Sequence, residues 1–258
     1  MKNIFAVAGV VIKELYRRKD FYVLFIITVL ICLVMASVNV FNDSKVARYL
    51  KEICLLLVWV SSLVIAVTTA ARQIPAEREN RTLLPLLAKP VTRMQLIFGK
   101  FFGCWFACGL TLLCFYIFFG ALSATREHQW PLANYFQAAV MHWFMLGIVV
   151  AMALLGSLVF AAPSSNSTIC FVIIGGILFV GRHLDQVAVS MREPLRTIVN
   201  ALYFTVPHLE FFDLRDLVIH NWPLIGWKYI VLALLYATAY ILIFLIGACL
   251  VFRRKPVN

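Results

Sequence analysis

The stretch ERENRTLLPLLAKPVTRMQLIFGK, residues 77–100, lies between two long apolar runs and combines both signs of charge with two prolines and five leucines. Pro75, just before it, suits the first turn of a helix. Thr82 is a candidate N-cap for a second, leucine-rich helix. That helix is expected to end near Lys89, because Pro90 disfavours helix in the residue before it.

The second half of the stretch predicts another helix. Thr92-x-x-Gln95 has the spacing of a capping box, so a helix is expected to begin at Arg93 and to continue into the next apolar run. The stretch therefore predicts a short leucine-bearing helix that is connected to the next helix by a bend at Pro90. Exposed leucines on a wet surface indicate a docking site. The alternative is an interfacial loop whose leucines rest in lipid.

Composition indicates that lipid surrounds most of the chain. The 258 residues are 63% hydrophobic and only 14% charged, whereas soluble domains average about a quarter charged residues. The formal net charge of +11 could suggest nucleic acid, but the basic residues form no stripe with aromatic side chains. They flank apolar runs instead, as expected on the cytoplasmic side of membrane spans. We therefore expect no nucleic-acid partner.

Apolar runs of about the length needed to cross a bilayer recur along the chain. Six are predicted: Phe21–Phe41, Ile53–Ala71, Phe101–Ser123, Phe136–Ala162, Ser167–Gly181 and Tyr229–Phe252. The expected fold is an all-α polytopic membrane protein, with residues 1–258 forming a single transmembrane domain.

The distribution of charge predicts the orientation. If both termini are cytoplasmic, the inner segments hold 14 of the 23 basic residues and 4 of the 12 acidic residues. The net charge is then +10 on the inner side and +1 on the outer side. This asymmetry follows the positive-inside rule, so residues 72–100 are expected inside and 182–228 outside.

Residues 1–20 are expected to form an interfacial helix. One face carries the apolar side chains, and the charged side chains fall elsewhere, as in helices that lie in the headgroup layer. The apolar run is short and shows no clear cleavage site, so a signal peptide is not expected. The apolar face is made by Ile4, Ala8, Val11, Ile12 and Leu15.

The membrane runs lack the groups that drive transport or catalysis. Their cores contain no Asp, Glu, Lys or Arg, and His142 is the one ionisable side chain among them other than cysteine and tyrosine. Ion-coupled transporters usually need buried charges. No nucleotide-binding loop or hydrolase motif occurs either. We expect no catalytic residue and no cofactor in this chain, so energy must come from a partner. A soft-metal path using Cys104, Cys108 and His142 is a minor alternative; no metal site is predicted.

The stretch at residues 77–100 resembles the cytoplasmic loop of type-2 ABC transporter permeases. The matching elements are the paired glutamates, Thr-Leu, two leucines, Pro-Val-Thr-Arg and Gly-Lys; Arg81 stands where the family often has glycine. The likeness is closest to permeases of nitrous-oxide-reductase maturation and of gliding motility. ALYFTVPHLEFFDLRD, residues 201–216, resembles the outer segment that the family places between spans five and six.

The resemblance implies a coupling helix that inserts into a groove of a cytosolic ABC ATPase. The residues that it assigns to this contact are Glu77, Glu79, Arg81, Thr82, Leu83, Leu84, Leu86, Leu87, Lys89, Pro90 and Arg93. It also implies a re-entrant outer segment within 182–228, for which the alternative is two helices on the outer surface. Its candidate residues are Leu195, Val199, Leu202, Pro207, Glu210, Phe211 and Phe212.

The function expected from these features is the permease subunit of an ATP-driven exporter in a bacterial inner membrane. The implied partners are two ATPase chains, which would hold ATP and magnesium, and a second copy of this chain or a similar permease. The alternative is a membrane mechanotransmitter that passes ATPase motion to an outer-side protein without moving a solute. Membrane lipid is expected around the spans in either case.

Overall fold

The computed structural model describes residues 2–17, 19–37, 44–79, 92–127, 132–190, 193, 196–197, 203 and 205–254. Every regular element within these residues is a helix. The helices are α1 (Lys2–Tyr16), α2 (Lys19–Ser37), α3 (Ser44–Ala71), α4 (Pro75–Glu79), α6 (Arg93–Glu127), α7 (Leu132–Val159), α8 (Pro163–Ser190), the 3-10 helix η1 (Leu209–Phe212), α10 (Arg215–Ile219) and α11 (Trp227–Arg254). The all-α prediction is confirmed for the described residues.

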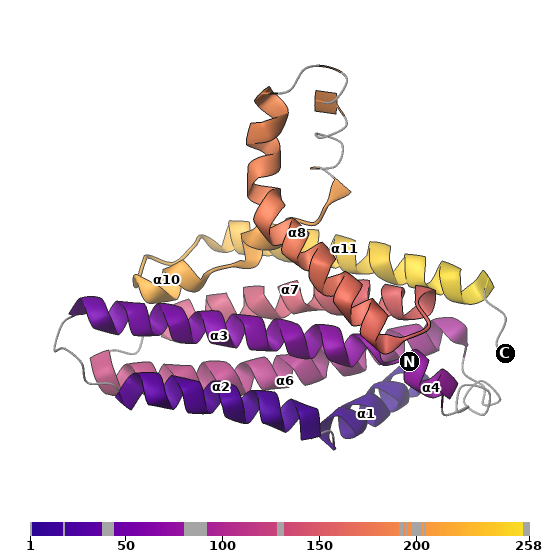
Figure 1. Cartoon of the computed structure of the whole chain (residues 1–258), viewed down its shortest axis with the longest axis horizontal. Helices are drawn as coiled ribbons and strands as arrows, with labels where there is room; N and C mark the ends of the chain where they lie inside the picture. The colour runs from indigo at the N-terminus through magenta and orange to yellow at the C-terminus, as the bar shows by residue number, and fades with distance from the viewer. Residues whose placement is uncertain are drawn as a thin grey trace.

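The long helices α2, α3, α6, α7 and α11 lie side by side as a bundle (Figure 1). α7 is central: 67% of its most apolar window is buried, whereas the corresponding window of α11 is 22% buried. The exposed side chains of α11 are largely apolar, including Leu232, Leu235, Ile243 and Ile246. A helix that is apolar on its outer face suits a lipid environment.

Four helical stretches of the described residues are long and apolar enough to cross a membrane. They are Lys51–Glu79, which covers most of α3 together with α4, Arg93–Ala124 in α6, Leu132–Val159, which is α7, and Trp227–Arg254, which is α11. The apolar parts found in α2 and α8 are shorter, at Phe25–Val34 and Pro163–Phe179. The number of six spans therefore stays a prediction. The chain is an integral membrane protein by the length and composition of these helices.

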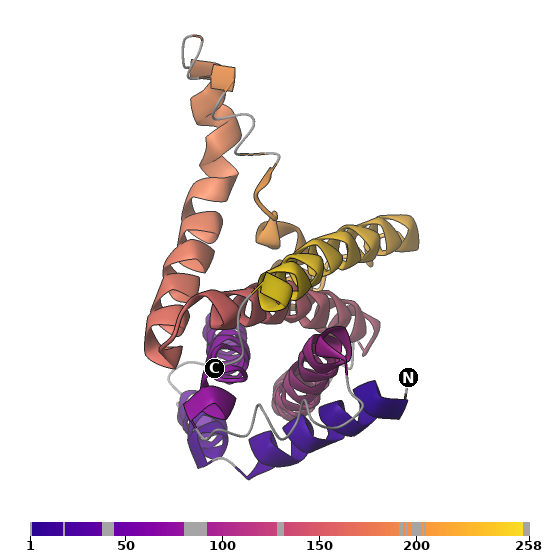
Figure 2. The same cartoon turned by 90° about the vertical axis from the view of Figure 1, so that its right-hand side faces the viewer.

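Helix α8 differs from the expected fifth span. It begins at Pro163, four residues before the expected start at Ser167, so the connection between α7 and α8 is only residues 160–162. Proline at the first helical position explains this start, because no intrahelical bond is lost there. The helix also continues to Ser190, beyond the expected end at Gly181. Its outer part stands away from the bundle (Figures 1 and 2).

The amphipathic N-terminal helix is confirmed, and its apolar face packs against α6. Ala8, Val11 and Leu15 are buried. Two glycines of α6 make the contact possible: a Cβ at Gly99 or at Gly103 would approach the Cβ of Val7 or Val11, respectively, to 2.7 Å. The Gly-x-x-x-Gly spacing on α6 thus brings α1 close to its backbone, as such pairs do in membrane helices.

Helices α6 and α7 are joined by a reciprocal tryptophan pair. The indole N–H of Trp105 donates to the carbonyl of Trp143 at 2.9 Å, and that of Trp143 donates to the carbonyl of Trp105 at 3.1 Å. The rings stack with centroids 4.7 Å apart. Each indole faces a glycine of the other helix, Gly109 or Gly147, where no side chain blocks it. The indole donors are therefore satisfied within the bundle.

Candidate functional site

The three predicted ATPase-contact residues that the structure describes fall at one end of the bundle, which we call the inner end. There α4, the first turns of α6 and the end of α11 lie together (Figure 1). Glu77 and Glu79 lie in α4, and Arg93 is the first residue of α6. The other predicted contacts lie outside the described residues: Arg81, Thr82, Leu83, Leu84, Leu86, Leu87, Lys89 and Pro90.

The start of α6 has the local structure that the sequence predicts. The side-chain oxygen of Thr92 accepts from the N–H of Gln95 at 3.2 Å, and the side-chain oxygen of Gln95 accepts from the N–H of Thr92 at 3.1 Å. This reciprocal pair is a capping box. It confirms the predicted helix from Arg93, which continues without a break to Glu127. Asn3 of α1 also reaches the Gln95 side chain, at 3.4 Å.

A buried lysine joins α6 to the end of α3 and to α4. Lys100 is 2% exposed, and its Nζ lies 2.7 Å from a carboxylate oxygen of Glu77. The same Nζ donates to the backbone carbonyl of Gln73 at 2.9 Å and to its side-chain oxygen at 3.2 Å. Three acceptors thus receive the three donors of one ammonium group. This full set of partners makes the burial of the charge tolerable.

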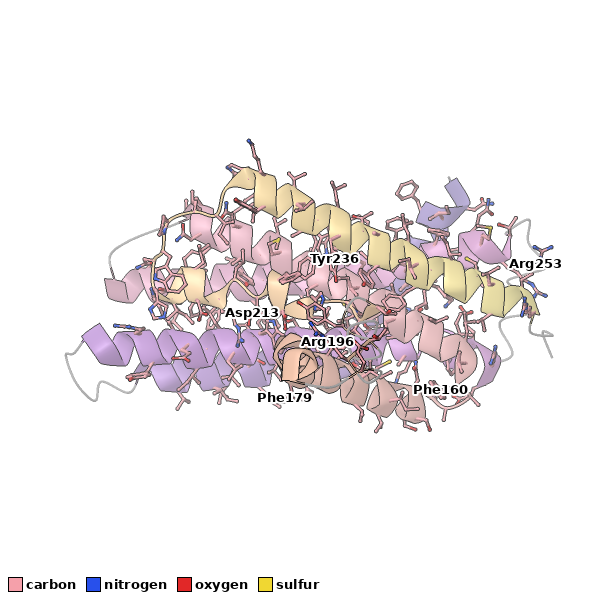
Figure 3. The ribbon with its side chains drawn as sticks, turned by 90° about the horizontal axis from the view of Figure 1, so that it is seen from above. Phe160, Phe179, Arg196, Asp213, Tyr236 and Arg253 are labelled. Atoms are coloured by element: carbon pink, nitrogen blue, oxygen red, sulfur yellow. The ribbon has the colours of Figure 1, made fainter. Side chains whose placement is uncertain are left out.

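Arg93 contacts the end of α11. Its guanidinium donates to the carbonyls of Phe252 and Arg253, at 2.7 and 3.2 Å, and lies 5.3 Å from the centroid of the Phe252 ring. The last carbonyls of a helix lack intrahelical partners, and a cation there is favourable. Figure 3 places Arg253 at this end of α11. Arg93 thus has an intramolecular role that sequence reasoning did not find.

At the opposite end, residues 206–226 fold over α3 and α7; we call this segment the outer cap. The side chain of Gln137 makes two bonds with the backbone of Ile225, donating to its carbonyl at 2.9 Å and accepting from its N–H at 3.2 Å. Asn134 donates to the carbonyls of Leu217 and Trp222. Two amides of α7 therefore fix the second half of the outer cap.

The predicted residues of the outer segment are only partly described. Leu195, Val199 and Leu202 lie outside the described residues, whereas Pro207 precedes η1 and is not helical, as expected. Within η1, Phe212 is buried, Phe211 is 52% exposed and Glu210 is half-buried. After Pro207 the chain forms two short pieces, η1 and α10, separated by Asp213 and Leu214.

That break places an ion pair against the bundle. Two nitrogens of the Arg215 guanidinium donate to the two carboxylate oxygens of Asp213, at 2.8 and 2.7 Å. The guanidinium also lies 5.2 Å from the centroid of the Trp59 ring on α3. Burial acts to raise the pKa of Asp213, but the hydrogen bonds and positive charge of Arg215 outweigh it and hold that pKa below its ordinary value. Figure 3 shows Asp213 beside α3.

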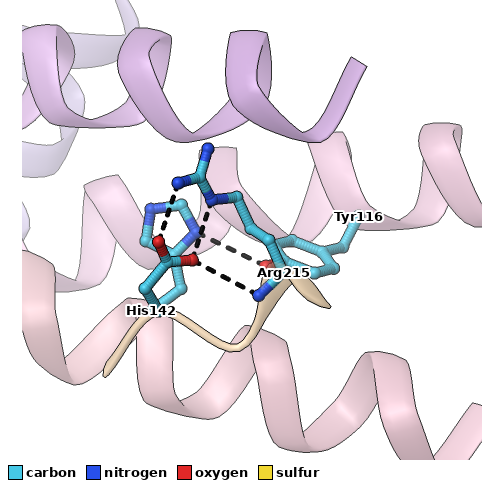
Figure 4. A network of polar contacts seen from close by, with 4 residues as sticks. Tyr116, His142 and Arg215 are labelled. Carbon is cyan, nitrogen blue, oxygen red and sulfur yellow. Dashed lines mark hydrogen bonds and ion pairs between the residues drawn. The ribbon is translucent and has the colours of Figure 1, made fainter. Parts of the chain in front are cut away.

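His142 lies next to this ion pair, with one ring nitrogen facing the Tyr116 hydroxyl (Figure 4). Its Nε2 is 2.9 Å from the Ser62 hydroxyl, and its Nδ1 is 3.5 Å from the Tyr116 hydroxyl. The side chain is 2% exposed. Among the described residues, no group of three or more His, Cys, Asp and Glu could hold a metal ion. The contacts of His142 link α7 to α3 and α6 instead.

A comparison with known families identifies the family of this chain. The family model described as ABC-2 family transporter protein matches residues 10–257, almost the whole chain. The chain belongs to the ABC-2 transporter family. It is therefore a transmembrane permease subunit of an ABC transporter, a kind of subunit that is generally not itself catalytic, and an ABC ATPase is the implied partner. No match was found among curated proteins.

Sequence reasoning identified the ABC-2 loop motif but not the partners of its charges. Lys100 was recognised as part of Gly-Lys, yet its contact with Glu77 joins residues on either side of the predicted coupling helix. Asp213 and Arg215 lie in the recognised outer stretch, but their position beside Trp59 and His142 was not predicted. The Asp-x-Arg spacing within an apolar stretch was the available signal, because a partly buried charge needs a partner.

Proposed function

We propose that this permease is the membrane half of an ATP-driven exporter, coupled to a cytosolic ABC ATPase through residues 72–100. The observation that carries the proposal is the arrangement at the inner end. Residue 79, which ends α4, and residue 92, which precedes α6, flank the leucine-rich segment, and both lie at the end of the bundle where α11 also ends (Figure 1). A segment attached there can project from the membrane helices toward a cytosolic partner.

The leucines of the segment would supply most of the binding free energy for the ATPase. Leu83, Leu84, Leu86 and Leu87 are the apolar side chains of this stretch. Filling an apolar groove with such side chains contributes roughly 1.5–3 kcal/mol for each one fully buried. The charged residues Glu79, Arg81 and Lys89 would then set the register, because charge complementarity fixes orientation more than affinity.

The export direction and the assembly are part of the proposal. The net charge of +10 on one side and +1 on the other favours cytoplasmic termini. The leucine-rich stretch between α4 and α6, residues 80–91, would then face the cytosolic ATPase, and we call it the coupling segment. One chain would be half of the transporter, paired with a second copy or a similar permease and with two ATPase chains. The cofactors ATP and magnesium would belong to the ATPase, and a bacterial inner membrane is the proposed location.

Purification with and without the ATPase tests this function. We expect the permease alone to hydrolyse no ATP, and we expect the complex to contain two membrane chains and two ATPase chains by native mass spectrometry. ATP should then drive movement of an amphiphilic probe toward the outer leaflet in reconstituted vesicles. Robust hydrolysis by the lone permease would contradict the proposal. ATP hydrolysis without transport, but stimulated by an outer-side protein, would favour the mechanotransmitter instead.

A further inference from the structure

Two cations on one face of α6 reach the carboxyl ends of two other membrane helices. Arg93 and Lys100 are seven residues apart, which is two helical turns and therefore the same face. Lys100 donates to the carbonyl of Gln73, two residues after the end of α3. Arg93 donates to the carbonyls of Phe252 and Arg253 in the last turn of α11. Arg93 thus completes the hydrogen bonding of a helix end whose carbonyls lack intrahelical partners, and Lys100 bonds to the turn that joins α3 to α4.

These contacts surround the coupling segment on both sides. On its entry side, Lys100 also pairs with Glu77 of α4 at 2.7 Å. On its exit side, Arg93 directly follows the capping box made by Thr92 and Gln95. The described residues on either side of the coupling segment are therefore bonded to α11 and to the turn after α3.

The position of Lys100 argues against a simpler explanation, which is that both cations only neutralise lipid phosphates. An ammonium group that serves lipid headgroups reaches toward the interface. Lys100 is 2% exposed and has three acceptors within the chain. Its charge is directed into the protein, so it stabilises a contact between helices.

The same helices lead to the outer cap. α3 runs without a break from Ser44 to Ala71 and carries Trp59, over whose ring the Arg215 guanidinium lies. A helix of this length is stiff, so a shift at its inner end also moves Trp59. Because Trp59 contacts Arg215, a shift of α3 can be transmitted to the outer cap through residues of this chain alone.

We propose that Lys100 and Arg93 are positioning residues that couple the coupling segment to α3 and α11, so that motion of the ATPase reaches the outer cap. This inference rests on the proposed function, because it assumes that the ATPase docks on the coupling segment. It goes further by assigning a mechanical role to two internal contacts. Lys100 is 2% exposed, so it would act on the transmission of motion rather than on the binding of the ATPase.

Hydrogen–deuterium exchange on the permease alone in lipid nanodiscs tests the contacts themselves. We expect Lys100→Met to speed exchange in α4, residues 75–79, and Arg93→Gln to speed exchange in the last turn of α11. Lys13→Met and Arg253→Gln are matched controls, because these side chains are exposed. Unchanged exchange at both places, or a uniform rise along the whole chain, would overturn the proposal, since the latter indicates only lower global stability.

Exchange in the complex with the ABC ATPase tests the transmission. In the unaltered and Lys13→Met complexes, vanadate trapping should change exchange in residues 209–219, which form the two short helices of the outer cap. The Lys100→Met complex should bind the ATPase and hydrolyse ATP but lose this change. An equal change in the Lys100→Met complex, or none in the unaltered complex, would contradict the proposal. If no ABC ATPase binds the unaltered chain, the proposed function fails, while exchange on the permease alone still decides the two contacts.

Discussion

At the scale of single residues, the ion pair of Asp213 and Arg215 shows how the outer cap holds charge beside apolar helices. The two side chains are 17% and 25% exposed, respectively. The pair lies between the surface case, worth about 0–1 kcal/mol, and the buried case, where removing one partner costs about 3–5 kcal/mol. Its bidentate geometry and the neighbouring Trp59 ring place it above an ordinary surface pair.

The lowered pKa of Asp213 makes the stability of the cap depend on pH. The ionised carboxylate stabilises the folded state above the ordinary pKa of about 3.9, and this contribution is lost as the pH falls through the lower folded pKa. We expect Asp213→Asn to lower stability by about 1–3 kcal/mol at pH 7, and by progressively less below about pH 4. Thermal unfolding in detergent measures both values.

The control for this variant is Asp216→Asn, which removes an exposed carboxylate three residues away. It should change stability far less at pH 7, because exposed charges contribute about 0–1 kcal/mol. Equal losses for the two variants, or a loss for Asp213→Asn that does not shrink in acid, would show that the ion pair has no special role in the folded cap.

At the scale of elements, the close contact of α1 with α6 depends on the absence of a side chain at two positions of α6. We expect Gly103→Ala to destabilise the protein by about 1–3 kcal/mol, because its Cβ would come within 2.7 Å of the Cβ of Val11. Gly9→Ala is the matched control, since nothing lies within 4 Å of its added Cβ. Thermal unfolding compares the two. A Gly103→Ala protein as stable as the control would mean that α1 separates readily from α6.

Local sequence patterns predicted the ends and faces of several elements correctly. Pro75 begins α4, the capping box of Thr92 and Gln95 begins α6, and the buried face of α1 carries Val11. These features depend on contacts within a few residues. A proline in a first turn and a reciprocal cap have the same meaning in almost any fold, so they can be read without tertiary information.

Features set by distant contacts were not predictable in this way. The pairing of Lys100 with Gln73 and Glu77 needs the antiparallel arrangement of α3 and α6. The extension of α8 to Ser190 passes through charged residues that read as the start of an outer segment. The break between η1 and α10 follows from the position of Asp213 against Arg215, which overrides the periodicity of the neighbouring apolar residues.

At the scale of the whole molecule, the distribution of charge predicts that the outer end of α8 faces away from the cytosol. A single cysteine at Ser190, the last residue of α8, should react with an impermeant thiol reagent in intact cells. The labelling needs a background in which all seven native cysteines are replaced, because Cys114 is exposed and Cys249 is partly exposed. Labelling that occurs only after the membrane is opened would reverse the proposed orientation and remove the coupling segment from the cytosol.

The central claim is that the leucine-rich segment of this ABC-2 permease grips the ATPase. Losing even half of two buried leucine contacts should weaken docking at least tenfold, because each is worth roughly 1.5–3 kcal/mol and about 1.4 kcal/mol is one decade. The most direct measurement is recovery of the ABC ATPase with the permease, comparing the unaltered chain, the double variant Leu84→Asp and Leu87→Asp, and the control Leu84→Met and Leu87→Met at equal expression. The account predicts that the aspartate variant inserts normally but loses the ATPase, while the methionine variant keeps it. Equal recovery of the ATPase with all three chains would contradict it and would leave the leucines resting in lipid.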